Sequence, residues 1–454
     1  MTVVQASKPT LPPCDHTAPT YRGADRETVL GDRQRFAHPA LFALYAEPLM
    51  IVHGHMQYLW DHTGKRYLDG IAGIVTVSCG HGHPKIVERV KRQLDEVQHT
   101  TTIYLHPNLS EAAKKLASKM PEGLDVTYFC NSGSEANELA VAMARLYTGN
   151  EDILAVRNGY HGGTATAMGL TSHSTWKFGM PQGGRIHHVS CPDPYRSKFS
   201  GTPEEIAEQS VNELKELIQF TTPGKVAGFL AEPIQGVGGA THGAPNYLRM
   251  AYDVVREHCG LCIADEVQTG FGRTGDHYWG FENFGVVPDM VVMAKGIGNG
   301  FPIGAVTTRR EIAEALTGRI HFNTFGGNPL CMAAASAVLD VIDEDGLQEN
   351  SRVVGGRLKA GLQQLQTRHR QVGDVRGMGL MLGFELVKDR VTKEPAPAET
   401  AQLLESCREM GLLIGKGGYF GNVVRFKPPM CLTEEDAEFA LAVIDESLSQ
   451  IEAD

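Results

Sequence analysis

The stretch Leu261-Cys-Ile-Ala-Asp-Glu-Val-Gln268 is an apolar run that ends in two carboxylates. Such a run, without polar alternation, is typical of a strand buried on both faces of a sheet. Similar short runs occur at Val126–Cys130, 226–230 and Met290–Met293, and helical patterns follow the first two at 134–148 and 245–258. Strands that alternate with helices predict an α/β fold with a largely parallel sheet covered by helices on both faces.

The remainder of the chain suggests further units around this sheet. Residues 1–35 are polar with several prolines and predict an N-terminal arm, and residues 36–70 are expected to join a small domain. We place the large domain at 71–330 and a smaller α+β domain at 331–454. In the latter, helices are expected near 330–345, 349–369, 398–410 and 433–451, and strands near 379–387, 412–414 and 422–427.

Composition excludes several classes of protein. The chain has 454 residues, 42% of them hydrophobic, and 42 Lys and Arg against 53 Asp and Glu give a net charge of −11. An acidic chain without a long basic run is not expected to bind nucleic acid. No apolar run is long enough to span a membrane, and residues 1–20 lack the apolar core of a secretory signal.

The cysteines indicate a reducing compartment. Nine cysteines are scattered from Cys14 to Cys431, which predicts free thiols in the cytoplasm, with an organelle matrix not excluded. Cys259-Gly-Leu-Cys262 has no second cysteine pair to complete a metal site, so we expect packing. Cys79-Gly-His-Gly-His83 lacks further ligands nearby and predicts a turn before a helix at Pro84. No metal site is therefore expected.

The stretch Asn131-Ser-Gly-Ser-Glu-Ala-Asn137 lies between a predicted strand and a predicted helix. Its small residues leave backbone N–H groups free at the helix N-terminus, where the helix dipole favours an anion such as phosphate. A turn closed by a Ser/Glu helix cap would use the same residues. The stretch has neither the lysine of a P-loop nor the glycine spacing of a dinucleotide site.

Two strand ends carry ionisable side chains. Asp265 ends a buried strand at the edge where open α/β sheets bind ligands, although a helix cap or structural ion pair is the alternative. Lys295 follows Met293-Ala294 and precedes a glycine-rich segment without a helical pattern, which excludes a dinucleotide motif. Burial beside small residues would lower the pKa of this lysine and make it nucleophilic.

Taken in chain order, these features describe a pyridoxal phosphate (PLP) site. The helix start at 133–134 would take the phosphate, and the loop with Tyr160 and His161 would supply a ring to stack on the cofactor. Asp265 would keep the pyridinium nitrogen protonated. Lys295 would form the Schiff base with the cofactor.

At these motifs the chain resembles the class-III aminotransferases, PLP enzymes of fold type I, from about residue 38 to the C-terminus. Within that class it is most similar to the alanine–glyoxylate type, which also handles β-alanine and 3-aminoisobutyrate. The resemblance implies a large domain with a mostly parallel seven-stranded sheet and a smaller α+β domain. The stretches that carry it are 68–77, 131–139, 231–236, 263–275, 294–302 and 321–329.

The resemblance also implies roles for single residues. Lys295 and Asp265 would be catalytic, and Arg425 would clamp the substrate carboxylate as a bidentate fork. Glu232 would pair with Arg425 when a substrate lacks an α-carboxylate, and Tyr45 would border the substrate. The other residues expected to bind the cofactor are Ser132, Gly133, Ser134, Tyr160, His161, Glu232, Val267, Gln268 and Thr324.

Thr324 is expected to reach the cofactor of the neighbouring subunit, which implies a homodimer with shared active sites; a tetramer is also possible. Members that act on GABA or ornithine usually carry an arginine directly after His-Gly in the aromatic loop, whereas here Gly163 follows His161-Gly162. This difference favours small amino acids as substrates.

The expected reaction is therefore a ping-pong transfer of an amino group from alanine, β-alanine, 3-aminoisobutyrate or a similar amine to pyruvate or glyoxylate. An aminomutase, a decarboxylating transaminase and a broad amine–pyruvate ω-transaminase would share the same cofactor residues and remain alternatives.

Overall fold

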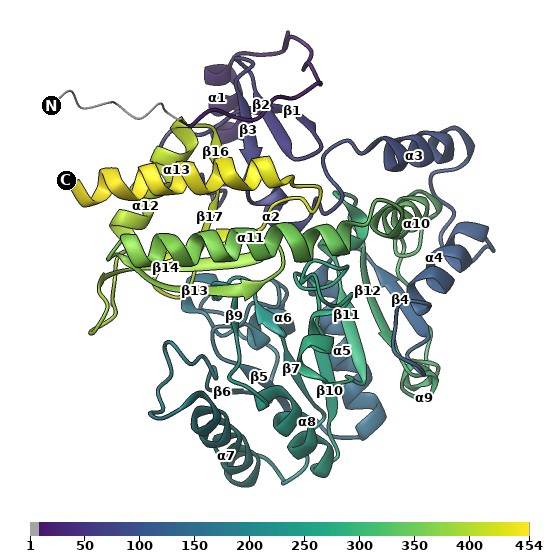
Figure 1. Cartoon of the computed structure of the whole chain (residues 1–454). Helices are drawn as coiled ribbons and strands as arrows, with labels where there is room; N and C mark the ends of the chain where they lie inside the picture. The colour runs from purple at the N-terminus through teal and green to yellow at the C-terminus, as the bar shows by residue number, and fades with distance from the viewer. Residues whose placement is uncertain (1–8, 454) are drawn as a thin grey trace, which may run out of the picture.

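Seven short strands build the central sheet of the protein, and the computed structural model describes residues 9–453 of the chain. β10 lies in the middle of this sheet, so Asp265 ends its central strand (Figure 1). In spatial order the strands are β4 (Val126–Cys130), β12 (Gly304–Thr308), β11 (Met290–Met293), β10 (Leu261–Asp265), β7 (Gly228–Ala231), β5 (Ile153–Val156) and β6 (Ile186–Val189).

The sheet is mostly parallel, which confirms the predicted fold class. β10 pairs in parallel with β7 and β11, and β5 pairs in parallel with β7 and β6. β12 is the exception, since it runs antiparallel to both β11 and β4. Three of the predicted strands have the expected bounds, and the run at 226–230 forms its strand from Gly228 onward. β5, β6 and β12 were not predicted.

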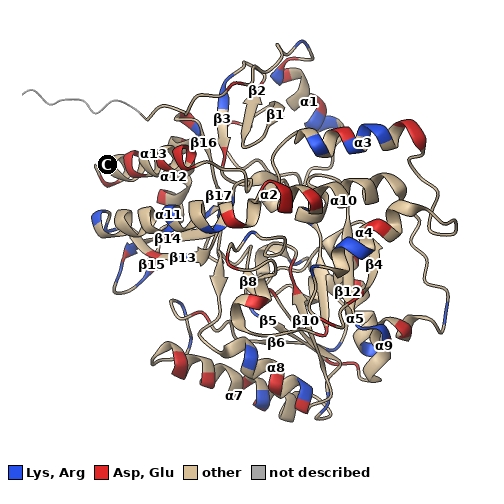
Figure 2. Cartoon of the chain, turned by 45° about the vertical axis from the view of Figure 1, so that its right-hand side comes forward, with Lys and Arg blue, Asp and Glu red and all other residues tan. Residues whose placement is uncertain are grey.

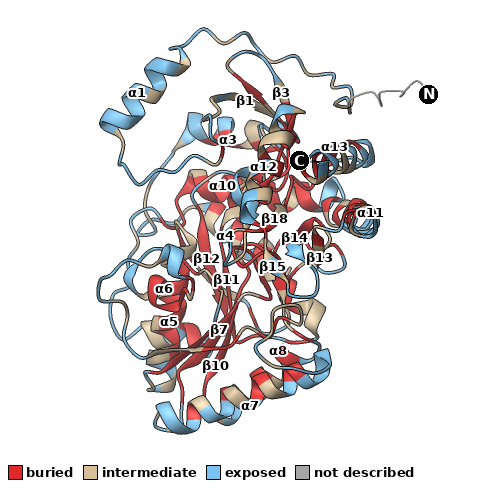
Figure 3. Ribbon diagram, turned by 90° about the vertical axis from the view of Figure 1, so that its left-hand side faces the viewer, coloured by how far each residue is buried: buried red, intermediate tan, exposed pale blue. Residues whose placement is uncertain are grey.

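Helices cover both faces of the sheet, as expected from strands that are apolar throughout and do not alternate with polar residues. In β10, Leu261 and Ile263 pack in the cluster that contains α5 (Gly133–Thr148). Cys262 and Ala264 point to the opposite face and pack in the cluster that contains α7 (Pro203–Thr221) and α8 (Tyr247–Glu257). Figure 3 shows the buried strands between these two layers of helices.

The C-terminal part forms a second, antiparallel sheet with helices packed beside it (Figure 1). The predicted helices at 330–345, 349–369, 398–410 and 433–451 are confirmed within a few residues, whereas β13 was not predicted. The strands are β13 (Val372–Met378), β14 (Met381–Asp389), β18 (Val423–Phe426), β17 (Gly415–Gly417) and β15 (Glu394–Pro395). The helices are α10 (Pro329–Glu344), α11 (Leu347–Arg368), α12 (Pro397–Glu409) and α13 (Glu434–Ala453).

The N-terminal residues lie against this C-terminal part. β1 (Ile51–His55), β2 (Tyr58–Asp61) and β3 (Arg66–Asp69) form a small sheet that β16 (Leu412–Leu413) completes by pairing in parallel with β3. The described part of the predicted arm, from residue 9 onward, leads into one helix, α1 (Arg26–Phe36), which has no buried residue. The residue limits of the domains stay a prediction.

Shorter elements connect these sheets. They are α2 (Ala72–Val75), α3 (Pro84–Glu96), α4 (Pro107–Ala117), α6 (Ala165–Leu170), α9 (Arg310–Ala313), β8 (Ile234–Gln235), β9 (Thr241–His242) and the 3-10 turns η1 (Ser174–Trp176), η2 (Gly280–Phe284), η3 (Lys295–Gly298) and η4 (Glu314–Leu316). Basic and acidic side chains are interspersed on outer helices such as α3 and α7 (Figure 2). Within residues 9–453, no helix is long and apolar enough to cross a membrane.

The packing of α11 on the β13–β14 turn supplies a test of the fold. A Cβ on Gly355 would lie 2.2 Å from the carbonyl carbon of Gly379, whereas one on the adjacent Gly356 would meet nothing within 4 Å. We expect Gly355→Ala to destabilise the protein by about 1–3 kcal/mol, because the backbone of α11 or of the β13–β14 turn would have to move to make room for the methyl group. Gly356→Ala should instead stabilise it by about 0.5–1 kcal/mol, because alanine restricts the unfolded chain and favours the helix. Thermal and urea unfolding of the pair measures this, and equal stabilities would contradict the packing.

Candidate active site

A cavity of about 180 Å³ opens where the carboxyl ends of β10 and β11 meet the N-terminus of α5. This is the sheet edge at which open α/β folds bind ligands. Most of the site residues predicted from the sequence line this cavity. Asn137, Gly162 and Ala294 also line it and were not predicted. The lining residues are Gly133, Ser134, Asn137, Tyr160, His161, Gly162, Glu232, Asp265, Val267, Gln268, Ala294 and Lys295.

Asp265 is held rigidly by three donors. Nδ1 of His161 lies 2.7 Å from Oδ2 of Asp265, and Nδ2 of Asn137 donates to the same oxygen at 3.1 Å. The backbone N–H of Val267 donates to Oδ1 at 3.1 Å. Asn137 also donates to the carbonyl oxygen of His161 at 2.8 Å, so it fixes both partners. The side chain of Asp265 is therefore aimed into the cavity by a closed network.

This network decides the charge of the pair. Burial alone would raise the pKa of Asp265, but the hydrogen bonds from His161 and Asn137 outweigh it and lower the pKa. Burial alone would lower the pKa of His161, but the hydrogen bond and charge of Asp265 raise it. We conclude that Asp265 is an anion at neutral pH and that a cation is the favoured partner inside the cavity.

Glu266, the carboxylate next to Asp265 in the chain, has a different environment. Glu266 lies outside the cavity and accepts hydrogen bonds from the hydroxyl of Thr269 and from the backbone N–H groups of Gly280 and Phe281, at 2.7–2.8 Å. Burial raises its pKa to about 7. Of the two strand-end carboxylates, only Asp265 faces the cavity; Glu266 ties η2 to the sheet.

The start of α5 provides an anion cradle. Gly133 and Ser134 are the first residues of the helix and line the cavity, where their N–H groups and the helix dipole face inward. The hydroxyl of Ser134 accepts from the N–H of Gly163 at 3.1 Å. A Cβ on Gly162, whose φ is +130°, would lie 2.2 Å from the Ser134 oxygen, so a side chain would fill the cradle.

The helix cap that the sequence offered as an alternative for 131–137 is also present, and it is formed by Ser132 and Glu135 rather than by Gly133 and Ser134. The hydroxyl of Ser132 accepts from the N–H of Glu135 at 3.2 Å, and the Glu135 carboxylate accepts from the N–H of Asn131 at 2.6 Å. Ser132 does not line the cavity. The cap and the cradle use neighbouring residues of one helix start.

Lys295 comes directly after Ala294, two residues beyond the end of β11, and it lines the cavity. Its backbone has a φ of +49°, a left-handed conformation that costs about 1–3 kcal/mol in a non-glycine residue. Burial lowers the pKa of the amine, while the charges of Asp265 and Glu232 act in the opposite direction. Strain and desolvation at one lysine, next to a buried aspartate, are features of functional sites.

Tyr160 and Glu232 border the same cavity. The ring of Tyr160 packs edge-on against Trp176, with 5.2 Å between the ring centroids. Glu232 accepts from the backbone N–H groups of Tyr160 at 3.0 Å and Gly236 at 2.6 Å, and burial raises its pKa. Glu232 thus fixes the loop that carries the tyrosine.

Gln268 is positioned by a lysine that the sequence did not single out. The amine of the buried Lys427 donates to Oε1 of Gln268 at 3.3 Å and to the carbonyl oxygen of Gly236 at 3.0 Å. A Cβ on Gly236 would lie 2.2 Å from the Gln268 amide. With its oxygen taken by Lys427, the Gln268 side chain has its NH2 group left to donate into the cavity.

Arg425, on β18, lies beside the cavity rather than in its lining. Its Nε is buried and has no hydrogen-bond partner among residues 9–453, and burial lowers its pKa to about 10 while the charge of Glu232 opposes this. The positive charge of Arg425 also helps to lower the pKa of Lys295. A half-buried guanidinium without an ion-pair partner in the described chain is suited to bind a carboxylate.

Two predicted residues lie elsewhere. Tyr45 is buried in the core and its hydroxyl donates to the carbonyl oxygen of Ile414 at 3.4 Å, next to β17. Thr324 is exposed, and the neighbouring Asn323 is tied to the segment after β4, since Nδ2 of Asn131 donates to the Asn323 amide oxygen at 3.0 Å. Neither residue lines the cavity of this chain.

The histidines and cysteines set aside above have other partners. His81 bonds Asp69 at 2.7 Å, and His83 bonds Asp345 at 2.9 Å. Across residues 9–453, no three His, Cys, Asp or Glu side chains are grouped so that they could hold a metal. All nine cysteines lie in this range and are free.

The residues that line the cavity fit PLP. Asp265 can hold a cationic ring nitrogen, the start of α5 can hold a phosphate, and Lys295 lines the same cavity with an amine that can bind the cofactor covalently. Nε2 of His161 and Oδ1 of Asn137 are buried without partners among the described residues, which leaves polar capacity around the ring position. No part of this set requires a metal.

The chain belongs to the class-III aminotransferases: the family description Aminotransferase class-III matches residues 43–448. It is a PLP-dependent aminotransferase that moves amino groups between amino acids and keto acids.

Individual relatives agree. The chain is 53% identical to alanine–glyoxylate aminotransferase 2 homolog 2, mitochondrial, of Arabidopsis thaliana, over 97% of this chain and 91% of that protein. It is 43% identical to the mitochondrial alanine–glyoxylate aminotransferase 2 of Homo sapiens, over 98% and 90%. A PLP-bound amine transaminase from an uncultivated Pseudomonas species superposes with a TM-score of 0.85 at 31% identity, over 92% and 98%.

Lys427 supplies a test of the site. We expect Lys427→Met to weaken PLP binding about 5- to 50-fold, because the carbonyl of Gly236 loses its partner and Gln268 its orientation. The visible absorbance of the bound cofactor should shift with it. Cofactor titration of the apoenzyme measures both, with the exposed Lys416→Met on β17 as the control. Identical affinity and spectrum in the two variants would show that Lys427 does not position Gln268.

Proposed function

We propose that this aminotransferase takes its amino group from a small amino acid or amine, such as alanine, β-alanine or 3-aminoisobutyrate, and gives it to pyruvate or glyoxylate. The observation that carries the proposal is Arg425, a half-buried guanidinium without an ion pair among the described residues, whose charge acts on Lys295 and is opposed by Glu232. Its fork matches one carboxylate. The names of the plant and human relatives support alanine and glyoxylate.

The roles of the site residues follow from their positions. When bound, PLP supplies a ring that takes up the electron pair released at the substrate Cα. Lys295 would join the resting enzyme to the cofactor, and its neutral Nζ would then carry the proton away from the substrate Cα; desolvation helps to keep it neutral. Asp265 would hold the proton on the ring nitrogen. Gly133 and Ser134 would bind the phosphate, Tyr160 would stack on the ring and Gln268 would donate to the ring oxygen.

Gly163 follows His161-Gly162, at the position where members that act on GABA or ornithine usually carry an arginine. It is exposed, and as a glycine it supplies no second cation to hold a distal carboxylate. A compact substrate with one carboxylate on Arg425 suits this arrangement. An aminomutase would turn over without a keto acid and a decarboxylating transaminase would release CO2, whereas a broad ω-transaminase would accept amines that have no carboxylate.

We also propose that the enzyme is a homodimer in which Thr324 of the partner subunit approaches the phosphate. Two segments, 103–105 and 320–325, expose large apolar side chains, and the rings of His99 and Phe325, 5.3 Å apart, connect the two parts of the chain. Such a contiguous exposed patch is typical of a subunit interface. The exposed residues are Ile103, Tyr104, Leu105, Ile320, Phe322 and Phe325.

The proposed compartment is the cytoplasm, with an organelle matrix as the alternative. The free cysteines support a reducing compartment. The names of the plant and human relatives favour the mitochondrial matrix as that alternative. Fractionation of cells that express the chain distinguishes the two.

A half-reaction panel tests the proposed donor. Without a keto acid, alanine, β-alanine and 3-aminoisobutyrate should each remove the visible absorbance of the bound cofactor, and GABA and taurine should do so far more slowly. Lys295→Ala should slow the reaction by roughly 1,000-fold or more, since it removes the proton carrier. The exposed Lys388→Ala serves as the control. Full turnover by Lys295→Ala, or fastest reaction with GABA, would contradict the proposal.

The interface is tested separately. Ile320→Asp places a charge in the proposed apolar contact and should shift the protein from dimer to monomer in sedimentation experiments, with a parallel loss of cofactor affinity. Val391→Asp, an equally exposed apolar residue far from this patch in the chain, is the matched control. An unchanged dimer with Ile320→Asp would place the interface elsewhere.

A further inference from the structure

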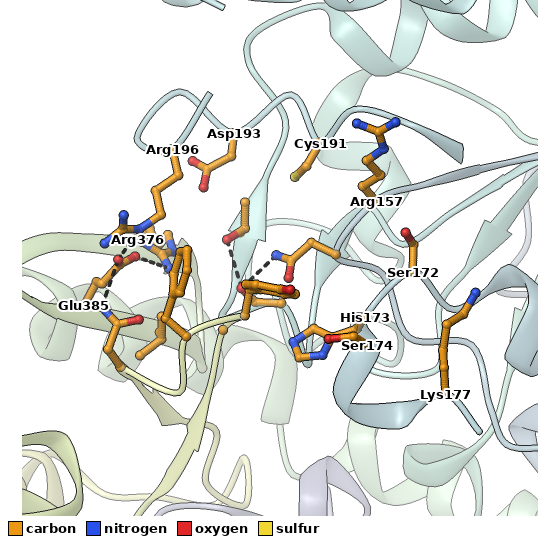
Figure 4. Close-up of a pocket in the computed structure, with 18 residues that line it drawn as sticks. Arg157, Ser172, His173, Ser174, Lys177, Cys191, Asp193, Arg196, Arg376 and Glu385 are labelled. Carbon is orange, nitrogen blue, oxygen red and sulfur yellow. Dashed lines mark hydrogen bonds and ion pairs between the residues drawn. The ribbon is translucent and has the colours of Figure 1, made fainter. Parts of the chain in front are cut away.

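A second and larger cavity, of about 490 Å³, lies between the large sheet region and the C-terminal sheet (Figure 4). Its size is that of a site for a small organic molecule. On one side it is lined by the segment that leads through η1, and on the other by β13, β14 and the β17–β18 turn. None of the residues that line the PLP cavity lines this one.

One side of the second cavity is basic and uncompensated. The exposed Arg157 and the half-buried Lys177 form no ion pair with any residue in 9–453, and burial lowers the pKa of Lys177 without a carboxylate to offset it. The hydroxyls of Ser172 and Ser174 lie on the same side (Figure 4). Two unpaired cations and two hydroxyls in a concave surface form a receptor for an oxyanion.

His173 strengthens this conclusion. It is only 4% exposed, yet neither ring nitrogen has a hydrogen-bond partner among the described residues. The backbone of Gly418 lies near the ring but completes no hydrogen bond with it, and burial lowers the pKa of the imidazole. A buried ring with unused polar atoms in a cavity wall is costly unless a ligand satisfies it.

The opposite side is paired or acidic. Arg376 binds Asp374 at 2.7 Å and Glu385 at 3.0 Å, and Arg196 binds Glu385 at 2.5 Å. The buried carboxylate of Asp193 also lines this side and accepts from the backbone N–H of Tyr195 at 2.9 Å. Figure 4 shows this group across the cavity from Arg157 and Lys177. Because the arginines on this side are already paired with carboxylates, we expect an anion to bind more strongly on the side of Arg157 and Lys177.

The cavity is also connected to the active site through short chain segments. Asn158 lines it two residues before Tyr160, and Val423 lines it two residues before Arg425. Lys177 follows Trp176, whose ring packs on Tyr160. A ligand in this cavity would therefore contact the segments that hold the stacking ring and the substrate arginine.

We propose that this cavity is a second anion site, which binds the carboxylate or phosphate group of a small metabolite. Arg157 and Lys177 bind its oxygens, and the ring N–H of His173 donates to it. The ring of Tyr419, 5.3 Å from His173 between centroids, covers the body of the ligand. Occupancy of this site fastens the large sheet region to the β17–β18 turn.

Calorimetric titration of the PLP-loaded enzyme in phosphate-free buffer tests the proposal, with inorganic phosphate and succinate as probes. The variants are Arg157→Gln/Lys177→Gln and His173→Asn. A matched control, Lys91→Gln/Arg310→Gln, removes the same charge from exposed positions. Arg425→Gln separates the second site from the substrate carboxylate site. The visible absorbance of the cofactor reports that each variant is folded.

We expect wild type and the control to bind a probe at a site that survives Arg425→Gln. Arg157→Gln/Lys177→Gln should weaken this binding roughly 10- to 100-fold, and His173→Asn should weaken it less. Whichever probe binds more tightly at this site identifies carboxylate or phosphate as the preferred group. Binding that is lost in Arg425→Gln, or unchanged in the double variant, would overturn the proposal, whether or not the enzyme transfers amino groups.

Discussion

The buried contact between Asp265 and His161 is the constraint on which the active site depends. A carboxylate at the end of a fully buried strand would ordinarily take up a proton, and a neutral acid could not hold a cationic ring nitrogen. His161 and Asn137 prevent this by donating to one oxygen of Asp265. Because Asn137 belongs to α5 and His161 to the loop after β5, the charge of the site requires three elements to be in register.

The same geometry explains why each neighbouring residue has its own role. Glu266 faces away from the cavity, where it anchors η2, so two adjacent carboxylates act on different sides of the strand end. The start of α5 divides its residues in a similar way: Ser132 caps the helix, while Gly133 and Ser134 face the cavity. Lys295 occupies a left-handed backbone position after β11, at the start of η3, and η3 packs against α10.

Much of the fold was predictable because strands buried on both faces are continuous apolar runs. β10 and β11 are of this kind and were predicted with their observed bounds. β5 (Ile153–Val156) is also a buried apolar run, yet it was missed. β6 has two histidines in the edge strand Ile186–Val189, and β12 begins with glycine and ends with two threonines. Their sequences do not resemble a strand, and only pairing with β5, β11 and β4 makes them strands.

The sequence by itself determined the chemistry of the site: an aspartate and a lysine at strand ends, a glycine-serine helix start and an aromatic loop, in the order of a PLP enzyme. Local residue types and spacings carry this information, because each feature is completed within a few residues. Only the tertiary structure decided which residues support them. Asn137, Lys427 and the unpaired His173 act through contacts with residues distant in the chain, and no local pattern records such contacts.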